Sequence, residues 1–259
     1  MKMKIMGEGM KKDASGREVV VEMQKLKKSF GNKHVLEEIN FSMYKGENLA
    51  ILGKSGTGKS VLIKCIAGLL KQDEGNLHLF GKDIATLSNQ KLEAARKRIG
   101  FLFQSGALYD SMTVRENLEF PLKRQKNKPG VDEMNELVIE ALRNVGLEDT
   151  IDKQTTGLSG GMRKRLGLAR TLILKPEIML YDEPTTGLDP ITSREISNLI
   201  IEIQRKYNTS SIIITHDIAC VKITADRVIV LKDGRCFAEG TFDELQNSAD
   251  EWVSSFLKD

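Results

Sequence analysis

The sequence contains few of the residues that usually hold metal ions or form disulfides. Three cysteines and three histidines are scattered over 259 residues. No two cysteines have CxxC spacing, and no group of histidine and cysteine has the spacing of a zinc site. The pattern excludes a disulfide framework and a cysteine-based metal site. It favours the reduced, mostly buried thiols of a cytosolic protein.

Long hydrophobic stretches are also absent from the sequence. The N-terminal segment carries charges without a continuous apolar run, so we predict no signal peptide but a flexible tail over residues 1–18. Apolar runs elsewhere, such as VLIKCIAGLL at 61–70, are much shorter than the ~20 residues that a membrane-spanning helix needs. We therefore expect a chain that does not cross a membrane by itself.

The sequence has no large excess of charge of one sign. Its formal net charge is +3 at pH 7, from 39 Lys and Arg against 36 Asp and Glu. So small an excess neither indicates nor excludes a surface for nucleic acid, and partners must be inferred from motifs. The motifs below imply no nucleic-acid partner.

Short β-branched runs alternate with helical patterns along most of the chain. Strands are predicted at 19–23, 39–44, 48–53, 75–81, 99–103, 177–182, 211–215 and 227–231. The first two are joined by a turn around Gly31 and Asn32, and three helices are predicted between about 113 and 170. The alternation predicts an α/β fold, with helices on the faces of a mostly parallel sheet and a helical insertion over about 105–170.

The segment GKSGTGKS at 53–60 matches the phosphate-loop pattern G-x-x-x-x-G-K-[ST], between a predicted strand and a predicted helix. Its glycines let backbone N–H groups surround a β-phosphate, and the helix N-terminus favours negative charge. Lys59 is predicted to reach the β- and γ-phosphates, and the Ser60 hydroxyl to bind Mg²⁺. The predicted nucleotide-binding residues here are Gly53, Lys54, Ser55, Gly56, Thr57, Gly58, Lys59, Ser60 and Val61.

Two carboxylates follow the apolar strand in IMLYDEP at 178–184. Asp182 is predicted to hold Mg²⁺ through water, and Glu183 to act as the general base on the attacking water. An acidic strand end is often only a solvated terminus, but the phosphate loop upstream favours the catalytic interpretation.

A second glycine-rich tract, LSGGM at 158–162, opens the basic segment RKRLGLAR. Ser159, Gly160 and Gly161 begin a predicted helix, whose N–H groups and dipole favour an anion. The helical insertion carries this tract away from the nucleotide of its own chain. We therefore predict a homodimer in which one copy binds ATP through Lys59 and the other closes the site with Ser159 and Gly160.

These motifs, in this order and spacing, resemble those of the ATP-binding cassette (ABC) family over residues 20–245. The resemblance implies ATP hydrolysis with Mg²⁺ on a P-loop NTPase (RecA-like) core, with an N-terminal antiparallel β subdomain and an inserted α-helical subdomain. It also implies an ABC ATPase domain over 19–245 and a C-terminal helical segment over 246–259.

The resemblance further assigns roles to single residues. Phe30 stands where the family has an adenine-stacking aromatic, although a core position is equally compatible with its place before a turn. Gln104 matches the glutamine that senses Mg²⁺ and the attacking water, and His216 matches the switch residue that contacts the γ-phosphate. Asp189 belongs to a loop that crosses the dimer interface. Met162 departs from the family's commonest signature, which has glutamine there, without removing a backbone donor.

Two segments, FLFQSGALYDSMTVRENLEFPL and LSGGMRKRLGLARTL, are similar to the ATPases of Mce-associated lipid transporters, including the maintenance-of-lipid-asymmetry system and its chloroplast relatives. The C-terminal GTFDELQNSADEWVSSFL resembles the same subfamily. This implies a peripheral subunit on the cytoplasmic face of the inner membrane that moves phospholipid or another lipid between bacterial membranes. Its partners would be an integral membrane permease and an Mce-domain substrate-binding protein. Tyr109 and Met112 are the candidate permease contacts, although packing within the insertion is the alternative for either residue.

Other classes of P-loop protein fit less well. Translation-type ABC proteins carry two cassettes in one chain, and chromosome-type members insert a long heptad coiled coil; neither feature is present. A P-loop kinase has no use for LSGGM or for the THD at 215–217. An ABC ATPase of a non-transport membrane complex, such as a cell-division regulator, remains as an alternative.

Overall fold

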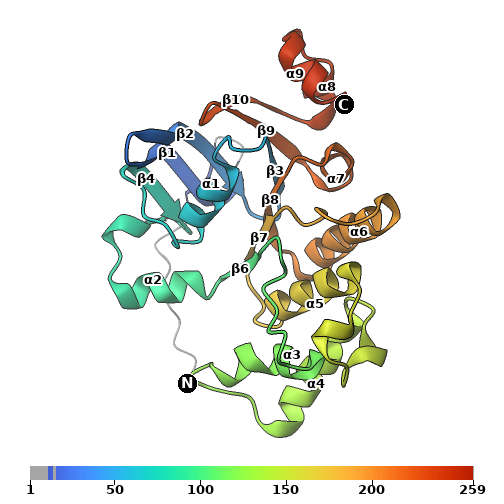
Figure 1. The fold of residues 1–259 in the computed structure, drawn as a ribbon. Helices are drawn as coiled ribbons and strands as arrows, with labels where there is room; N and C mark the ends of the chain where they lie inside the picture. Colours follow the sequence, from blue (N-terminus) through green and yellow to red (C-terminus); the bar gives the residue numbers. More distant parts are fainter. Residues whose placement is uncertain (1–10, 14–15, 259) are drawn as a thin grey trace.

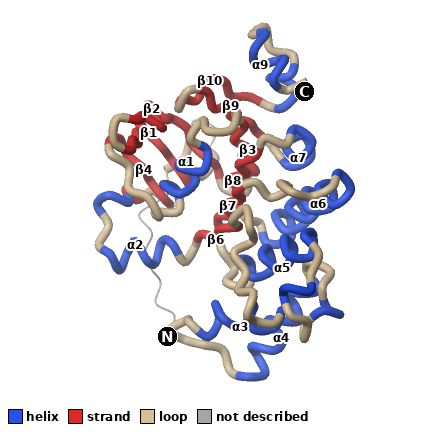
Figure 2. The backbone as a smooth tube through the Cα atoms, in the orientation of Figure 1, coloured by secondary structure: helices blue, strands red, loops and turns tan. Residues whose placement is uncertain are grey.

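The computed structural model describes residues 11–13 and 16–258, which form two β-sheets and surrounding helices (Figures 1 and 2). Of the predicted tail, residues 1–10 and 14–15 lie outside the described residues. In its described part Lys12 and Glu18 form an isolated antiparallel bridge, and the Val19 N–H donates to the Lys11 carbonyl at 2.9 Å.

The smaller sheet is antiparallel and has the strand order β2-β1-β4-β5. Its strands are β1 (Val19–Phe30), β2 (Lys33–Tyr44), β4 (Glu74–Leu79) and β5 (Lys82–Asp83). The predicted strands at 19–23 and 39–44 were too short. The reason is the two-residue turn at Gly31 and Asn32, which pairs Phe30 with Lys33 directly. Cross-strand hydrogen bonds thus extend through polar residues that an apolar pattern does not mark.

The larger sheet has the order β10-β9-β3-β8-β7-β6, in which only the β10–β9 pair is antiparallel. Its strands are β3 (Asn48–Leu52), β6 (Ile99–Leu102), β7 (Ile178–Asp182), β8 (Ser210–Thr215), β9 (Arg227–Lys232) and β10 (Arg235–Gly240). Three of the four inner strands, β3, β8 and β7, are buried at every residue. Helices cover both faces of such strands, so their sequences do not alternate. The predicted, mostly parallel sheet is confirmed.

Nine α-helices occur in the described part of the chain. They are α1 (Lys59–Ile66), α2 (Asn89–Arg96), α3 (Val114–Lys123), α4 (Val131–Arg143), α5 (Gly160–Leu172), α6 (Pro190–Tyr207), α7 (Ile218–Thr224), α8 (Phe242–Gln246) and α9 (Glu251–Phe256). Helices α3, α4 and α5 gather at one end of the molecule, which confirms the helical insertion (Figure 1). The sequence patterns did not predict α2, α7 or β10. No helix among the described residues is both long and apolar enough to cross a membrane.

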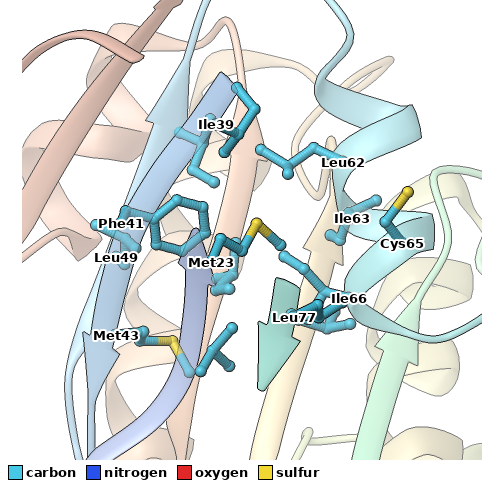
Figure 3. Packing of buried hydrophobic residues seen from close by; sticks show 14 of the residues in the cluster. Met23, Ile39, Phe41, Met43, Leu49, Leu62, Ile63, Cys65, Ile66 and Leu77 are labelled. Atoms are coloured by element: carbon cyan, nitrogen blue, oxygen red, sulfur yellow. The ribbon is translucent and has the colours of Figure 1, made fainter. Parts of the chain in front are cut away.

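Helix α1 packs in the core between the two sheets. Figure 3 shows Met23, Ile39 and Phe41 of the antiparallel sheet opposite residues of α1. Those α1 residues are Leu62, Ile63 and Ile66, all fully buried. Burial of such side chains stabilises a fold by about 1.5–3 kcal/mol each. The loop between β3 and α1 is therefore anchored at both ends by fully buried elements.

Candidate nucleotide site

The loop from Gly53 to Gly58 connects β3 to α1, as predicted, and its glycines are required by geometry. A Cβ atom at Gly53 would lie 2.6 Å from the Leu231 carbonyl oxygen. Gly58 has φ of 100°, and a Cβ there would lie 2.8 Å from the Val35 carbonyl oxygen. Gly58 is also the N-cap of α1 and provides no side-chain acceptor for the first N–H groups of the helix. The loop thus presents free helix N-terminal donors toward an anion.

The loop opens onto a cleft of about 810 Å³, a size typical of small-ligand sites. The cleft is lined by Phe30, Lys33, Val35, Gly53, Lys54, Ser55, Gly56, Gly58, Lys59, Ser60, Val61, Gln104, Glu183, His216 and Phe256. It therefore brings together most of the predicted nucleotide and catalytic residues from five separate parts of the sequence. Thr57 lies in the loop itself, where its Oγ1 donates to the Lys54 carbonyl at 2.9 Å.

Lys59 is held inside the phosphate loop. Its Nζ donates to the carbonyl oxygens of Gly53 at 2.7 Å and Lys54 at 3.1 Å, and lies 3.9 Å from Oε1 of Glu183. Burial lowers the pKa of the Lys59 ammonium, against the opposing effect of Glu183 and Asp182. The ammonium is thus pre-positioned on the inner wall of the loop, where a phosphate would meet it.

The two predicted Mg²⁺ ligands lie side by side. The Ser60 hydroxyl donates to Oδ1 of Asp182 at 3.3 Å across the gap between α1 and β7. Burial raises the pKa of Asp182, the hydrogen bond from Ser60 lowers it, and an adjacent cation would favour the ionised carboxylate further. A hydroxyl and a carboxylate oxygen are the hard donors that Mg²⁺ prefers, so these residues fit the ion.

Glu183 is fixed by several hydrogen bonds at the end of β7. Its Oε2 lies 2.9 Å from Nδ1 of His216 and accepts from the hydroxyls of Thr186 at 3.1 Å and Thr215 at 3.3 Å. Its φ is 53°, in the left-handed region that non-glycine residues seldom occupy. Such backbone strain is often found at functional sites. The imidazole of His216 remains 63% exposed.

Gln104 and Phe30 both line the cleft. Gln104 follows β6 and is exposed. Phe30 ends β1, and 49% of its surface is exposed, which excludes the core position that the sequence left open. Nζ of Lys28 lies 5.4 Å from the centre of the Phe30 ring. Phe30 is thus an exposed aromatic in the lining of the cleft.

The second glycine-rich tract and Asp189 do not line this cleft. Ser159 is the N-cap of α5, and its Oγ accepts from the Met162 N–H at 3.3 Å. Asp189 is the N-cap of α6, and Thr192 donates to it from both its N–H and its hydroxyl. These bonds lower the pKa of Asp189. Within one chain, Ser159, Gly160 and Asp189 are thus exposed helix N-termini apart from the nucleotide cleft.

The two glycines of the second tract differ in their surroundings. A Cβ at Gly161 would lie 2.6 Å from Cγ2 of Thr192, whose rotamer is held by its 2.6 Å bond to Asp189. At Gly160 the nearest atom would be Cδ2 of Leu188, at 3.5 Å. Gly161 is therefore a contact point between α5 and α6, whereas Gly160 is not.

We expect Gly161→Ala to destabilise the chain by about 1–3 kcal/mol, because α5 must move away from α6. The matched variant Gly160→Ala should change stability by less than about 0.5 kcal/mol, since it meets only ordinary contact distance. Urea denaturation of the purified proteins measures both values. Equal stability of the two variants would contradict the close approach of the helices.

The sequence did not indicate Lys33, Val35 and Phe256 as cleft residues, nor Lys164 as a buried neighbour of the site. Phe256 arrives from α9, far along the chain from the loop, and its position depends on the packing of the C-terminal segment. Lys164 had a detectable signal. It occupies the buried face of α5 with Gly161, Leu168 and Leu172, where helical spacing predicts apolar residues.

A phosphate loop after a parallel strand, another strand of the same sheet that ends in two carboxylates, and a helical insertion with a second glycine-rich tract define a P-loop ATPase. The family model described as ABC transporter matches residues 36–186. The chain belongs to the ABC transporter family and is an ATPase.

Three relatives show the range of transporters to which the chain is similar. It is 37% identical to the chloroplastic protein TRIGALACTOSYLDIACYLGLYCEROL 3 of Arabidopsis thaliana, over 92% of this chain and 73% of that protein. It is also 37% identical to the intermembrane phospholipid transport system ATP-binding protein MlaF of Haemophilus influenzae, over 92% and 90%. The methionine import ATP-binding protein MetN of Rhizobium johnstonii is 40% identical, over 88% of this chain and 62% of that protein.

Solved structures show the same fold. cbiO1 from Clostridium perfringens, part of the ABC transporter complex cbiONQ, superimposes with a TM-score of 0.80 at 31% identity, over 92% of this chain and 98% of that one. The dimeric ATP-binding cassette MJ0796, bound to ADP and Pi, gives a TM-score of 0.77 at 30% identity, over 85% and 98%. The predicted P-loop core with its inserted helical subdomain is thereby confirmed.

Proposed function

We propose that this chain is the ATP-hydrolysing subunit of a membrane transporter, and that two copies close around two shared ATP sites. The observation that carries the proposal is the division of the motifs within one chain. Lys59, Ser60 and Glu183 line the cleft, while Ser159 and Gly160 are exposed elsewhere. The dimeric state of the related cassette MJ0796 supports the use of the second tract by a partner copy.

Each predicted nucleotide or catalytic residue has a chemical role in this proposal. The phosphate loop and Lys59 bind the phosphates, and the Phe30 ring stacks on the adenine. Ser60, Asp182 and Gln104 would hold Mg²⁺, which supplies positive charge against the β- and γ-phosphate oxygens when it is bound. Glu183 accepts the proton of the attacking water.

The remaining roles belong to the residue beside Glu183 and to the residues that face the partner copy. His216 orients Glu183, as the 2.9 Å distance between its Nδ1 and Oε2 of Glu183 supports. In this proposal it also contacts the γ-phosphate. Ser159, Gly160 and Gly161 close the site of the partner copy with N–H donors. Asp189 organises the loop between the copies by capping α6.

The proposed cargo is phospholipid or another lipid moved between bacterial membranes. Two of the relatives named above support it, one by its printed function in intermembrane phospholipid transport. The methionine importer has a higher identity, 40%, but this chain spans only 62% of its length. The proposed location is the cytoplasmic face of the inner membrane, with a permease and an Mce-domain protein as partners. A non-transport membrane complex of the cell-division regulator type is the alternative.

Purification of the complex tests the cargo. A complex captured through this chain should contain a multi-span permease, and phospholipid vesicles should be able to donate or accept labelled lipid through it in the presence of ATP. Methionine should neither stimulate its ATPase activity nor be retained by it. ATP-dependent methionine uptake without lipid transfer would overturn the lipid assignment and leave the transporter assignment intact.

The proposed docking surface for the permease is the loop of residues 105–113. Asn117 fixes this loop, because its Oδ1 accepts from the Tyr109 N–H and its Nδ2 donates to the carbonyls of Tyr109 and Met112. Tyr109 is 39% exposed, and its ring packs against Phe120 at a centroid distance of 4.7 Å. A preformed loop with an exposed aromatic is a suitable anchor, since ordering it on binding costs little.

Tyr109→Ala combined with Met112→Ala is expected to release the chain from the permease, while ATP binding by the isolated subunit stays within twofold. Truncation of a central interface residue typically costs more than about 1 kcal/mol in binding free energy. Co-purification from detergent-solubilised membranes measures the loss. Leu69→Ala, which removes an apolar side chain that is 54% exposed elsewhere, is the control and should remain bound. Retention of the double variant would contradict this docking surface.

A further inference from the structure

Lys164 is a buried lysine that none of the roles above requires. It lies in the second turn of α5, and its side chain is only 7% exposed. Its Nζ donates to the backbone carbonyls of Gln104 at 2.5 Å and Glu183 at 3.1 Å. Burial lowers the pKa of the ammonium, and the carboxylates of Glu183 and Asp182 oppose this effect. A charge in such a place is costly unless hydrogen bonds offset its desolvation.

The two carbonyls that Lys164 binds come from neighbouring strand ends. Strands β6 and β7 are parallel, with Leu102 paired to Tyr181, and Gln104 and Glu183 each follow that pair by two residues. One ammonium thus joins the loops that carry the proposed Mg²⁺-sensing glutamine and the proposed general base. Gly167 lets α5 pack closely against the end of β6, since a Cβ at this position would lie 3.1 Å from Cδ1 of Leu102.

The backbone at Glu183 needs such support. Its left-handed φ of 53° is unfavourable for a residue with a side chain. Its N–H donates to the Ile214 carbonyl at 2.8 Å, which anchors the peptide on the β8 side. Its own carbonyl is held on the α5 side by Lys164. Together these bonds set the direction in which the carboxylate leaves the chain.

We propose that Lys164 is a positioning residue, which couples helix α5 to the backbone of Gln104 and Glu183. The N-terminus of α5 carries Ser159 and Gly160, the tract offered to the nucleotide of the second copy. A shift of α5 when that copy binds ATP would therefore move the base and the glutamine of its own chain. The inference rests on the roles proposed for Gln104 and Glu183.

The test compares Lys164→Met, which keeps most of the side-chain length but removes every donor, with Lys164→Gln, which keeps two donors on a chain one bond shorter. For Lys164→Met we expect kcat for ATP hydrolysis to fall by about 10- to 100-fold, because misplacement of reacting groups by about 1 Å has such effects. KM and the affinity for a fluorescent ATP analogue should stay within twofold. In Lys164→Gln, the fall in log kcat relative to wild type should be at most two thirds of the fall in Lys164→Met.

Arg165→Met is the matched control. It removes the adjacent cation of α5, whose guanidinium donates to the Val145 carbonyl and to Glu195, away from the cleft. Its kcat should stay within threefold of the wild-type value even if its melting temperature falls.

Three results would overturn the inference. They are an unchanged kcat in Lys164→Met, losses of kcat that follow melting temperature in all three variants, and no recovery in Lys164→Gln. Glu183→Gln, measured in parallel, distinguishes failure of the positioning role from failure of the proposed general base. If it is inactive while Lys164→Met is active, only the positioning role fails; if it too is active, the proposed base is wrong.

Discussion

Glu183→Gln is expected to slow ATP hydrolysis by about 10²- to 10⁴-fold, the range for loss of a general base. The amide has the shape of the carboxylate but cannot accept the proton of the attacking water. Its oxygen can still accept from the hydroxyls of Thr186 and Thr215, which hold the carboxylate at present. The cleft should therefore keep its geometry and its affinity for ATP.

The variant should consequently accumulate as a closed dimer with bound ATP. Steady-state phosphate release measures the rate, and size-exclusion chromatography with ATP and Mg²⁺ measures the dimer. Glu177→Gln is the control, since Glu177 pairs with Arg98 on the surface and should have no effect on turnover. A near-normal rate in Glu183→Gln would exclude Glu183 as the base.

A mixture of Lys59→Ala and Ser159→Arg chains is expected to regain ATPase activity that neither variant has alone. In each pure dimer both shared sites carry one defect. In a mixed dimer one site combines the intact Lys59 of one copy with the intact Ser159 of the other, and the second site carries both defects. An equal mixture contains half mixed dimers, so about a quarter of wild-type activity is the upper limit if the sites act independently.

Ser159→Arg also removes the N-cap of α5, which costs about 0.5–2 kcal/mol of stability. Ser159→Ala is therefore the matched control, because it loses the bond to the Met162 N–H without adding bulk at the exposed surface. The alanine variant should keep most of its activity, since backbone N–H groups supply the contact to the nucleotide. No recovery at any mixing ratio would show that Lys59 and Ser159 act within one chain.

The catalytic constellation was predictable from the sequence because each of its parts is a local pattern. The phosphate loop needs glycines at positions where a Cβ would collide with Leu231 or Val35, and this requirement leaves a readable signature. Asp182 and Glu183 stand at the end of a short, continuous apolar run, which is typical of a strand inside a parallel sheet. Parallel strands end at the same edge of a sheet, so motifs after separate strands meet there. The sequence therefore determined the chemistry of the cleft and the P-loop fold class.

The limits of the hairpin β1–β2 and the contribution of α9 depended on long-range packing. Hydrogen bonds between paired strands extended both strands through polar residues, and Phe256 joined the cleft only because α9 folds back onto the core. The exposure of Phe30 also depended on long-range packing, because the burial of a residue before a turn is set by the elements that pack around it.

Lys164 shows the same dependence most clearly. Its sequence context is a basic helix, in which a lysine is ordinarily solvated, and the apolar spacing of that helix shows only that the position is buried. The partners that make burial tolerable are the carbonyls of Gln104 and Glu183, 60 and 19 positions away along the chain. Backbone carbonyls carry no side-chain identity, so no sequence pattern could name them; they became partners when β6, β7 and α5 packed together.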